Sequence, residues 1–179
     1  MRARRPGESD AYTADLEQKQ IEKYAEVFSK VYHFHTIGLR YFNVFGPRQN
    51  PDGAYAAVIP RFIKAVVENK APVIYGDGKT SRDFTFVALA VQANIKAMLM
   101  DELHQHEAIN IAAGGATTLT QLANLIIAKA NSSLTPIYTD ERAGDIQHSL
   151  ADVSKAKQII SYSPDISLQE GLDSMLQKA

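Results

Sequence analysis

The sequence predicts an α/β fold. Segments with apolar residues at helical spacing alternate along the chain with short apolar runs typical of strands, and most of these runs stop at glycine or proline. This alternation is typical of layered structures in which helices pack on a sheet. The 179 residues, of which 45% are hydrophobic and 22% charged, are enough to bury a core and exclude a disordered or collagen-like chain.

The composition also excludes several classes of function. The 19 basic residues are balanced by 20 acidic ones, whereas a general nucleic-acid binder carries a basic excess. The absence of cysteine excludes disulfides, thiolate catalysis and cysteine-based zinc sites, and the five histidines lack the spacing of a metal site. No apolar run approaches the roughly 18 residues of a membrane span, and no signal-like apolar segment follows the N-terminal arginines. We therefore expect a cytoplasmic protein with no metal, membrane or nucleic-acid partner.

The first helix and the first strand are expected before residue 45. Residues 1–18 are polar and contain a Pro-Gly pair, so we expect an irregular arm there. From about Lys19, apolar side chains recur at helical spacing and predict a helix. The run Thr36–Val44 (TIGLRYFNV) is rich in β-branched and aromatic residues and is followed by a Gly-Pro turn, which predicts a strand.

The remainder of the chain continues the alternation. Helices are expected over 57–67, 87–100, 152–160 and 167–176, with another opening at residue 118, and strands over 72–75, 108–112 and 135–138. Two helices begin with a capping box, one at Thr118 with Gln121 and one at Ser167 with Glu170. Pro60 is compatible with its helix only in the first turn.

Four clusters combine residues suited to binding an anionic ligand. They are Arg40–Pro47 (RYFNVFGP), Gly53–Pro60 (GAYAAVIP), Tyr75–Phe84 (YGDGKTSRDF) and Arg142–Ile146 (RAGDI). The first places an asparagine where a strand ends, and the second places small residues before a helix N-terminus that can accept an anion. The third presents an arginine after a tight turn, and the fourth pairs a cation for phosphate with a carboxylate for sugar hydroxyls.

Each cluster also has a purely structural interpretation, and from the residues alone both interpretations stay open. Arg82 and Asp83 are alternatively a surface ion pair, and the Gly-Asp-Gly run is alternatively only a turn. Arg142 and Asp145 are alternatively a solvated loop, and Arg40 alternatively packs its aliphatic stem along the strand.

Together and in this order, the clusters resemble the carboxyl-terminal half of the extended short-chain dehydrogenase/reductases, in the NAD-dependent epimerase/dehydratase family. The matching strings are RYFNVFGPRQNPDGAYAAVIPRF, VIYGDGKTSRDFTFV, NIAAGGATTLTQL and ERAGDIQHSLADVSKA. The resemblance runs from about Ile21 to the end of the chain and is strongest to UDP-N-acetylglucosamine and other UDP-hexose 4-epimerases. It implies a UDP-sugar as the substrate and NAD as the cofactor.

The resemblance implies a role for each matched residue. Phe42 lies near the nicotinamide end of NAD, and Asn43 bonds the substrate diphosphate. The other implied contacts are Ala57 and Val58 packing on the substrate, Val73, Ile74 and Tyr75 around the uracil ring, Arg82 and Arg142 clamping the diphosphate, and Asp145 on ribose or sugar hydroxyls. Two guanidiniums suit two phosphate charges, and an aromatic face suits a base.

One family feature is missing from the sequence. Relatives carry Tyr-x-x-x-Lys on the helix before RYFN, where the tyrosine serves as acid and base. In register, these positions hold Ala14 and Gln18. The nearest pair, Tyr12 and Lys19, is seven residues apart, about 10.5 Å along a helix axis against about 6 Å for a spacing of four. We therefore assign no catalytic residue.

The sequence also contains no glycine-rich dinucleotide motif. We expect residues 19–179 to form the last Rossmann-like elements with a small α/β substrate-binding domain, without the N-terminal Rossmann half. The expected protein is a UDP-hexosamine 4-epimerase relative that acts at C4 through a transient 4-keto sugar, and whose isolated chain binds UDP without turnover. Alternatives are a non-catalytic binding module, an inert fragment, and a dehydratase or decarboxylase relative. The open edge of the strand over 36–44 predicts self-association or a complementing chain.

Overall fold

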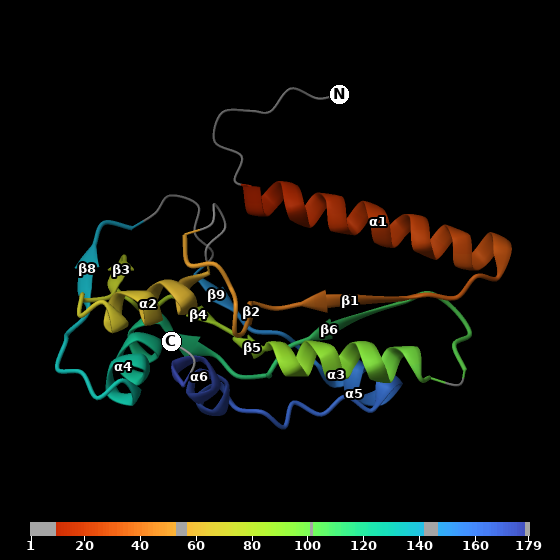
Figure 1. Cartoon of the computed structure of the whole chain (residues 1–179). Coiled ribbons are helices and arrows are strands. Elements are labelled where there is room, and N and C mark those ends of the chain that lie inside the picture. Colours follow the sequence, from red (N-terminus) through yellow and green to blue (C-terminus); the bar gives the residue numbers. More distant parts are fainter. Residues whose placement is uncertain (1–9, 53–56, 101, 142–146, 178–179) are drawn as a thin grey trace.

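The computed structural model describes residues 10–52, 57–100, 102–141 and 147–177, and it has the expected alternation of helices and strands (Figure 1). The helices are α1 Asp10–Tyr32, α2 Val58–Val67, α3 Val87–Met98, α4 Leu119–Lys129, α5 Ser154–Ile160 and α6 Leu168–Leu176. The strands are β1 Ile37–Tyr41, β2 Val44–Phe45, β3 Val73–Tyr75, β4 Ser81–Arg82, β5 Thr85–Phe86, β6 Glu107–Ile111, β7 Thr117–Thr118, β8 Ile137–Thr139 and β9 His148–Ser149.

The strands pair in small, mainly parallel sheets. β1 pairs in parallel with β6, β2 with β5, and β3 with β8. β4 lies between β7, to which it is antiparallel, and β9, to which it is parallel. These pairings join segments far apart in the sequence, since parallel strands require crossover connections. The α/β class predicted from the sequence is therefore confirmed.

Two hydrophobic cores support the chain. The first lies among α2, α4, α6 and β3, and the second among α3, α5 and β6 (Figure 1). Ile74, Leu122 and Ile126 are fully buried in the first core, and Leu89 and Ile111 in the second. The candidate site described below belongs to the first core.

The N-terminal helix is longer than the sequence suggested. α1 begins at Asp10, so residues 10–18 are helical and the expectation of an irregular arm is wrong there, whereas residues 1–9 lie outside the described part. The segment contains two alanines together with Leu16, Glu17 and Gln18, which are all good helix formers although the segment is mostly polar. α1 lies alongside β1 (Figure 1), where the Arg40 guanidinium donates to both carboxylate oxygens of Glu22, at 2.6 and 2.5 Å.

The helix starts agree with the local sequence signals. Both predicted capping boxes form, with Thr118 at the start of α4 and Ser167 at the start of α6. Pro60 is the third residue of α2, where its missing N–H costs no helical hydrogen bond. Within the described ranges, no helix has both the length and the apolar character needed to cross a membrane.

Candidate functional site

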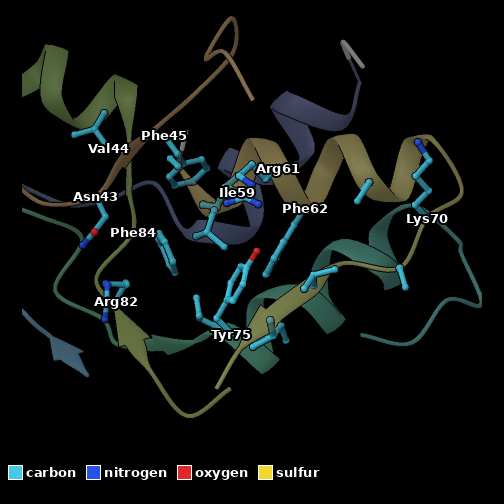
Figure 2. Close-up of a pocket in the computed structure, with 17 residues that line it drawn as sticks. Asn43, Val44, Phe45, Ile59, Arg61, Phe62, Lys70, Tyr75, Arg82 and Phe84 are labelled. Atoms are coloured by element: carbon cyan, nitrogen blue, oxygen red, sulfur yellow. The ribbon is translucent and has the colours of Figure 1, made fainter. Parts of the chain in front are cut away.

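A pocket of about 460 Å³ opens beside the first core. Most of its walls come from four segments: the β1–β2 connection, the start of α2, strand β3 and strand β4 (Figure 2). Leu119, at the start of α4, adds to the lining. The volume lies in the range of small-molecule sites, and the wall combines aromatic and aliphatic side chains with a few polar ones. This composition suits a ligand with a planar ring and a charged part.

Asn43 occupies the point where β1 ends and β2 begins. Its backbone is left-handed, with a φ of 40°, a conformation that asparagine tolerates better than most residues. Its Nδ2 donates to the carbonyl oxygen of Asp83 at 3.0 Å, and its own carbonyl accepts from the Thr85 N–H at 3.3 Å. These contacts fix the asparagine at the pocket wall.

Arg82 reaches the same end of the pocket from β4 (Figure 2). Its Nη1 donates to the carbonyl oxygens of Ser81 and Gln147, at 3.0 and 3.4 Å. The strand itself is fixed on its other side, where the Ser81 hydroxyl lies 2.9 Å from His148 Nδ1. The pocket therefore has a polar end built from an amide and a guanidinium, both of which can bind phosphate oxygens.

Strand β3 supplies the floor of the pocket. Ile74 points into the core and is fully buried, whereas Val73 and Tyr75, on the alternate face, are more exposed. The Tyr75 ring projects into the middle of the pocket and its hydroxyl points toward α2 (Figure 2). Phe62 and Phe84 complete this apolar middle, which offers an aromatic face to a base.

The start of α2 forms the opposite wall. Ala57, the residue that precedes the helix, has an extended backbone and makes no side-chain capping bond. Ala57 and Val58 both line the pocket, so the first turn of the helix is presented to a ligand. The small Ala57 side chain leaves the backbone there accessible.

Asp83 faces away from the pocket and is completely buried. Its carboxylate accepts hydrogen bonds from the backbone N–H groups of Ala113 and Gly114, both at 3.1 Å, and from Ala151 at 3.4 Å. Burial raises the pKa of this carboxyl above its ordinary range, while the surrounding N–H groups lower it. The interpretation of Arg82 and Asp83 as a surface ion pair is therefore wrong.

The structure gathers most of the residues that the resemblance implied. The residues predicted to bind substrate that line this pocket are Asn43, Ala57, Val58, Val73, Ile74, Tyr75 and Arg82. Arg142 and Asp145 lie outside the described residues. Phe42, assigned to NAD, does not line the pocket; it is half-buried against the second core, and its N–H donates to the Ile111 carbonyl at 3.1 Å.

Sequence reasoning missed several lining residues. They are Val44, Phe45, Ile59, Arg61, Phe62, Ala65, Lys70, Ala71, Phe84 and Leu119. For Arg61 and Ala65 a signal existed, since they lie three and seven positions beyond Val58 and therefore on the same side of a helix. The sequence gives no such signal for Lys70 and Leu119, because these residues line the pocket only as a result of how separate elements pack.

Comparisons with known proteins find relatives of this chain among enzymes that act on UDP-sugars. A UDP-N-acetylglucosamine 4-epimerase from Methanobrevibacter ruminantium M1, solved in complex with UDP-N-acetylmuramic acid, matches with a TM-score of 0.82 and 40% identity, covering 94% of this chain and 54% of that one. A putative UDP-glucose 4-epimerase of Methanocaldococcus jannaschii is 33% identical over 151 residues, 84% of this chain and 48% of that protein. A UDP-N-acetyl-alpha-D-glucosaminuronate decarboxylase of Bacillus cytotoxicus is 37% identical over 145 residues, 78% of this chain and 44% of that protein.

The chain thus spans about half the length of the relatives it matches. The NAD dependent epimerase/dehydratase family matches residues 15–112, more than half of the chain, and this stretch contains the pocket residues from Asn43 to Phe84. The structural likeness covers 94% of the chain and so extends well beyond this stretch. With the fold, the pocket and the family match in agreement, the chain belongs to the NAD-dependent epimerase/dehydratase family.

Proposed function

We propose that this chain binds the uridine diphosphate part of a nucleotide sugar, as the substrate-binding portion of a C4 epimerase. The observation that carries the proposal is the convergence of four separate segments, each with a residue suited to one part of UDP, on one pocket. The uracil ring packs on Tyr75 and β3, and the diphosphate lies at the Asn43 and Arg82 end. Arg142 adds a second phosphate contact and Asp145 a hydroxyl contact in this proposal.

The relatives support a UDP-sugar as the ligand, since those named above act on UDP-glucose, UDP-N-acetylglucosamine or a UDP-linked uronate. Of these, we propose a UDP-hexosamine, because the relative at 40% identity is the N-acetylglucosamine enzyme. The decarboxylase at 37% identity favours UDP-uronate as a second candidate. Comparing the affinities of the chain for UDP-N-acetylglucosamine and UDP-glucuronate distinguishes the two, because only the uronate brings a carboxylate.

The family depends on NAD, and a bound NAD would supply hydride transfer to and from the sugar. Of the residues that the resemblance implies, Phe42 alone is assigned to this cofactor, and it packs on the second core. Ala14 and Gln18 stand where relatives carry the acid/base tyrosine and its lysine, and neither side chain ionises. We therefore assign this chain sugar-nucleotide binding and derive no hydride step from it.

Titration calorimetry of the chain with UDP tests the proposal. We expect saturable binding that is weakened about tenfold or more in Arg82→Ala, because a charge-assisted hydrogen bond contributes roughly 1.5–3 kcal/mol. Lys23→Ala, which removes the same charge from exposed α1, is the matched control and should bind normally. Absence of heat with millimolar UDP would contradict the proposal.

We further propose that the chain self-associates or pairs with a complementing chain. Within the described residues β1 is hydrogen-bonded to β6 alone, so its other edge offers unpaired backbone groups. On α1, Ile21, Tyr24, Phe28 and Val31 recur on one helix face and are at least half exposed. Light scattering over a dilution series should detect a dimer or larger species, and a monomer at every concentration would contradict this part of the proposal.

A further inference from the structure

Among the residues that the structure describes, three with cationic side chains line the pocket, and two of these side chains have contacts of their own. Arg82 donates to backbone carbonyls at the polar end. Lys70, at the far end (Figure 2), is exposed and forms an ion pair with Glu68 at 2.7 Å. The third is Arg61, which belongs to α2 and lies between the other two. Within the described ranges, no hydrogen bond or ion pair joins its side chain to another residue.

Helix stability does not account for an arginine at this position. Arg61 is the fourth residue of α2, near the positive end of the helix dipole, where a cation is unfavourable. The first turn contains no acidic residue to offset it. Lys64, one turn later on the same helix, instead faces Asp52, with its ammonium 2.7 Å from the carboxylate.

The position of Arg61 in the pocket suggests what it binds. It comes from the α2 wall, next to Ile59 and above the tip of Tyr75, whereas Arg82 comes from β4 at the polar end (Figure 2). A nucleotide whose base lies on Tyr75 and whose phosphates extend toward Asn43 and Arg82 therefore passes the Arg61 guanidinium. The planar guanidinium suits phosphate because it donates two parallel hydrogen bonds.

We propose that Arg61 is a phosphate-binding residue of this pocket and recognises nucleoside phosphates together with Arg82 from the opposite wall. The inference rests on the proposed function, since it takes UDP as the ligand of the same pocket. It adds a binding residue from α2 to that function. It also specifies the class of ligand, because two guanidiniums on facing walls favour an anionic nucleotide over a neutral nucleoside.

The test compares uridine, UMP and UDP, titrated into the full chain by calorimetry and NMR. In Arg61→Ala we expect UMP and UDP to bind about tenfold more weakly, while uridine changes less than twofold, because only the phosphates lose a partner. Arg61→Lys should recover part of the lost affinity, since lysine restores the positive charge but cannot donate the two parallel hydrogen bonds of a guanidinium. The slope of log Kd for UDP against log salt should also become shallower in Arg61→Ala.

Lys64→Ala is the matched control, because it removes one positive charge from the same helix at a residue that does not line this pocket. It should leave all three affinities within twofold, and both alanine variants should melt close to the wild type. If the wild type binds UDP and Arg61→Ala binds it equally well, the inference fails while the proposed function stands. If Arg61→Ala weakens uridine binding as much as it weakens UDP binding, the inference also fails. If the wild type binds no nucleotide, the proposed function itself is overturned.

Discussion

The neighbouring residues Arg82 and Asp83 face opposite sides of the chain. The Arg82 guanidinium lines the pocket, whereas the Asp83 carboxylate is buried and accepts hydrogen bonds from backbone N–H groups of Ala113, Gly114 and Ala151. The arginine is thus attached to a peptide that two distant segments hold in place. The buried hydrogen bonds of Asp83 thus help to position Arg82, in addition to the contacts of the Arg82 guanidinium with the Ser81 and Gln147 carbonyls.

Replacing Asp83 should therefore weaken the fold. Asp83→Ala leaves three buried N–H groups without an acceptor, and we expect a loss of about 3 kcal/mol in the free energy of unfolding, measured in urea. Asp83→Asn keeps one acceptor oxygen and should cost less. Asp52→Asn, at an exposed carboxylate, is the control. An unchanged midpoint in Asp83→Ala would show that these hydrogen bonds contribute nothing.

The pH dependence of the same variants has a definite sign. Burial raises the folded-state pKa of Asp83, so the folded chain holds this proton more tightly than the unfolded chain does. The wild type should lose stability relative to Asp83→Asn as pH rises from about 4 through that pKa. Urea titrations of both proteins between pH 4 and 7 measure the difference, and the opposite slope would contradict the prediction.

Tyr162 should make the fold sensitive to alkali. Its hydroxyl donates to the Ala112 carbonyl at 2.9 Å, and burial raises its pKa to about 12. Since an unfolded tyrosine ionises near pH 10, its stabilising contribution is complete below that value and is lost as pH rises toward 12. Tyr162→Phe should cost about 1 kcal/mol at neutral pH, and this deficit should disappear by about pH 11. A deficit that stays constant up to pH 11 would contradict the assignment.

Gly171 should not tolerate a side chain, although it lies within a helix. A Cβ there would come within 2.7 Å of Phe45 Cζ and 2.9 Å of Phe86 Cδ2, whose rings pack 5.5 Å apart. We expect Gly171→Ala to destabilise the fold by about 1–3 kcal/mol despite the higher helix propensity of alanine. Gly115→Ala, where a Cβ would meet nothing within 4 Å, is the control. Circular-dichroism melts compare them, and an increase in Tm for Gly171→Ala would refute the predicted clash.

The Glu22 and Arg40 pair should help to hold α1 against β1. Arg40 lowers the pKa of the Glu22 carboxyl, so the stabilisation is present above the ordinary value near 4.5 and fades as pH falls below it. Glu22→Gln should increase hydrogen exchange across α1 at neutral pH and leave α4 unchanged. Glu26→Gln, on the same helix, is the control. Equal exchange in the wild type and Glu22→Gln would mean that other contacts hold the helix.

The sequence predicted the elements whose signals are local. The capping residues Thr118 and Ser167, the first-turn Pro60 and the strand at Ile74 were all identified from neighbouring residues. The two-residue strands, such as β4 at Arg82, were not, since two residues are too few to establish a periodicity. The start of α1 was missed because a polar segment rich in helix formers resembles a loop in hydrophobicity alone.

The site was predictable as far as the family motifs reach. Asn43, Tyr75 and Arg82 were assigned from their motifs, and the structure adds that they share one pocket. No family motif singles out Arg61, and the sequence signalled it only through its helical spacing from Val58. The contacts of Asp83 could not be predicted, because their donors lie 30 to 68 residues away in the chain.

The pocket walls join segments that share the core beneath them. A nucleotide that touches the strand end at Asn43, the helix wall at Val58 and the floor at Tyr75 would act as a non-covalent crosslink among these three segments. Its concentration would then set the melting temperature through mass action. The chain could in this way report its own ligand by thermal shift, even without turning it over.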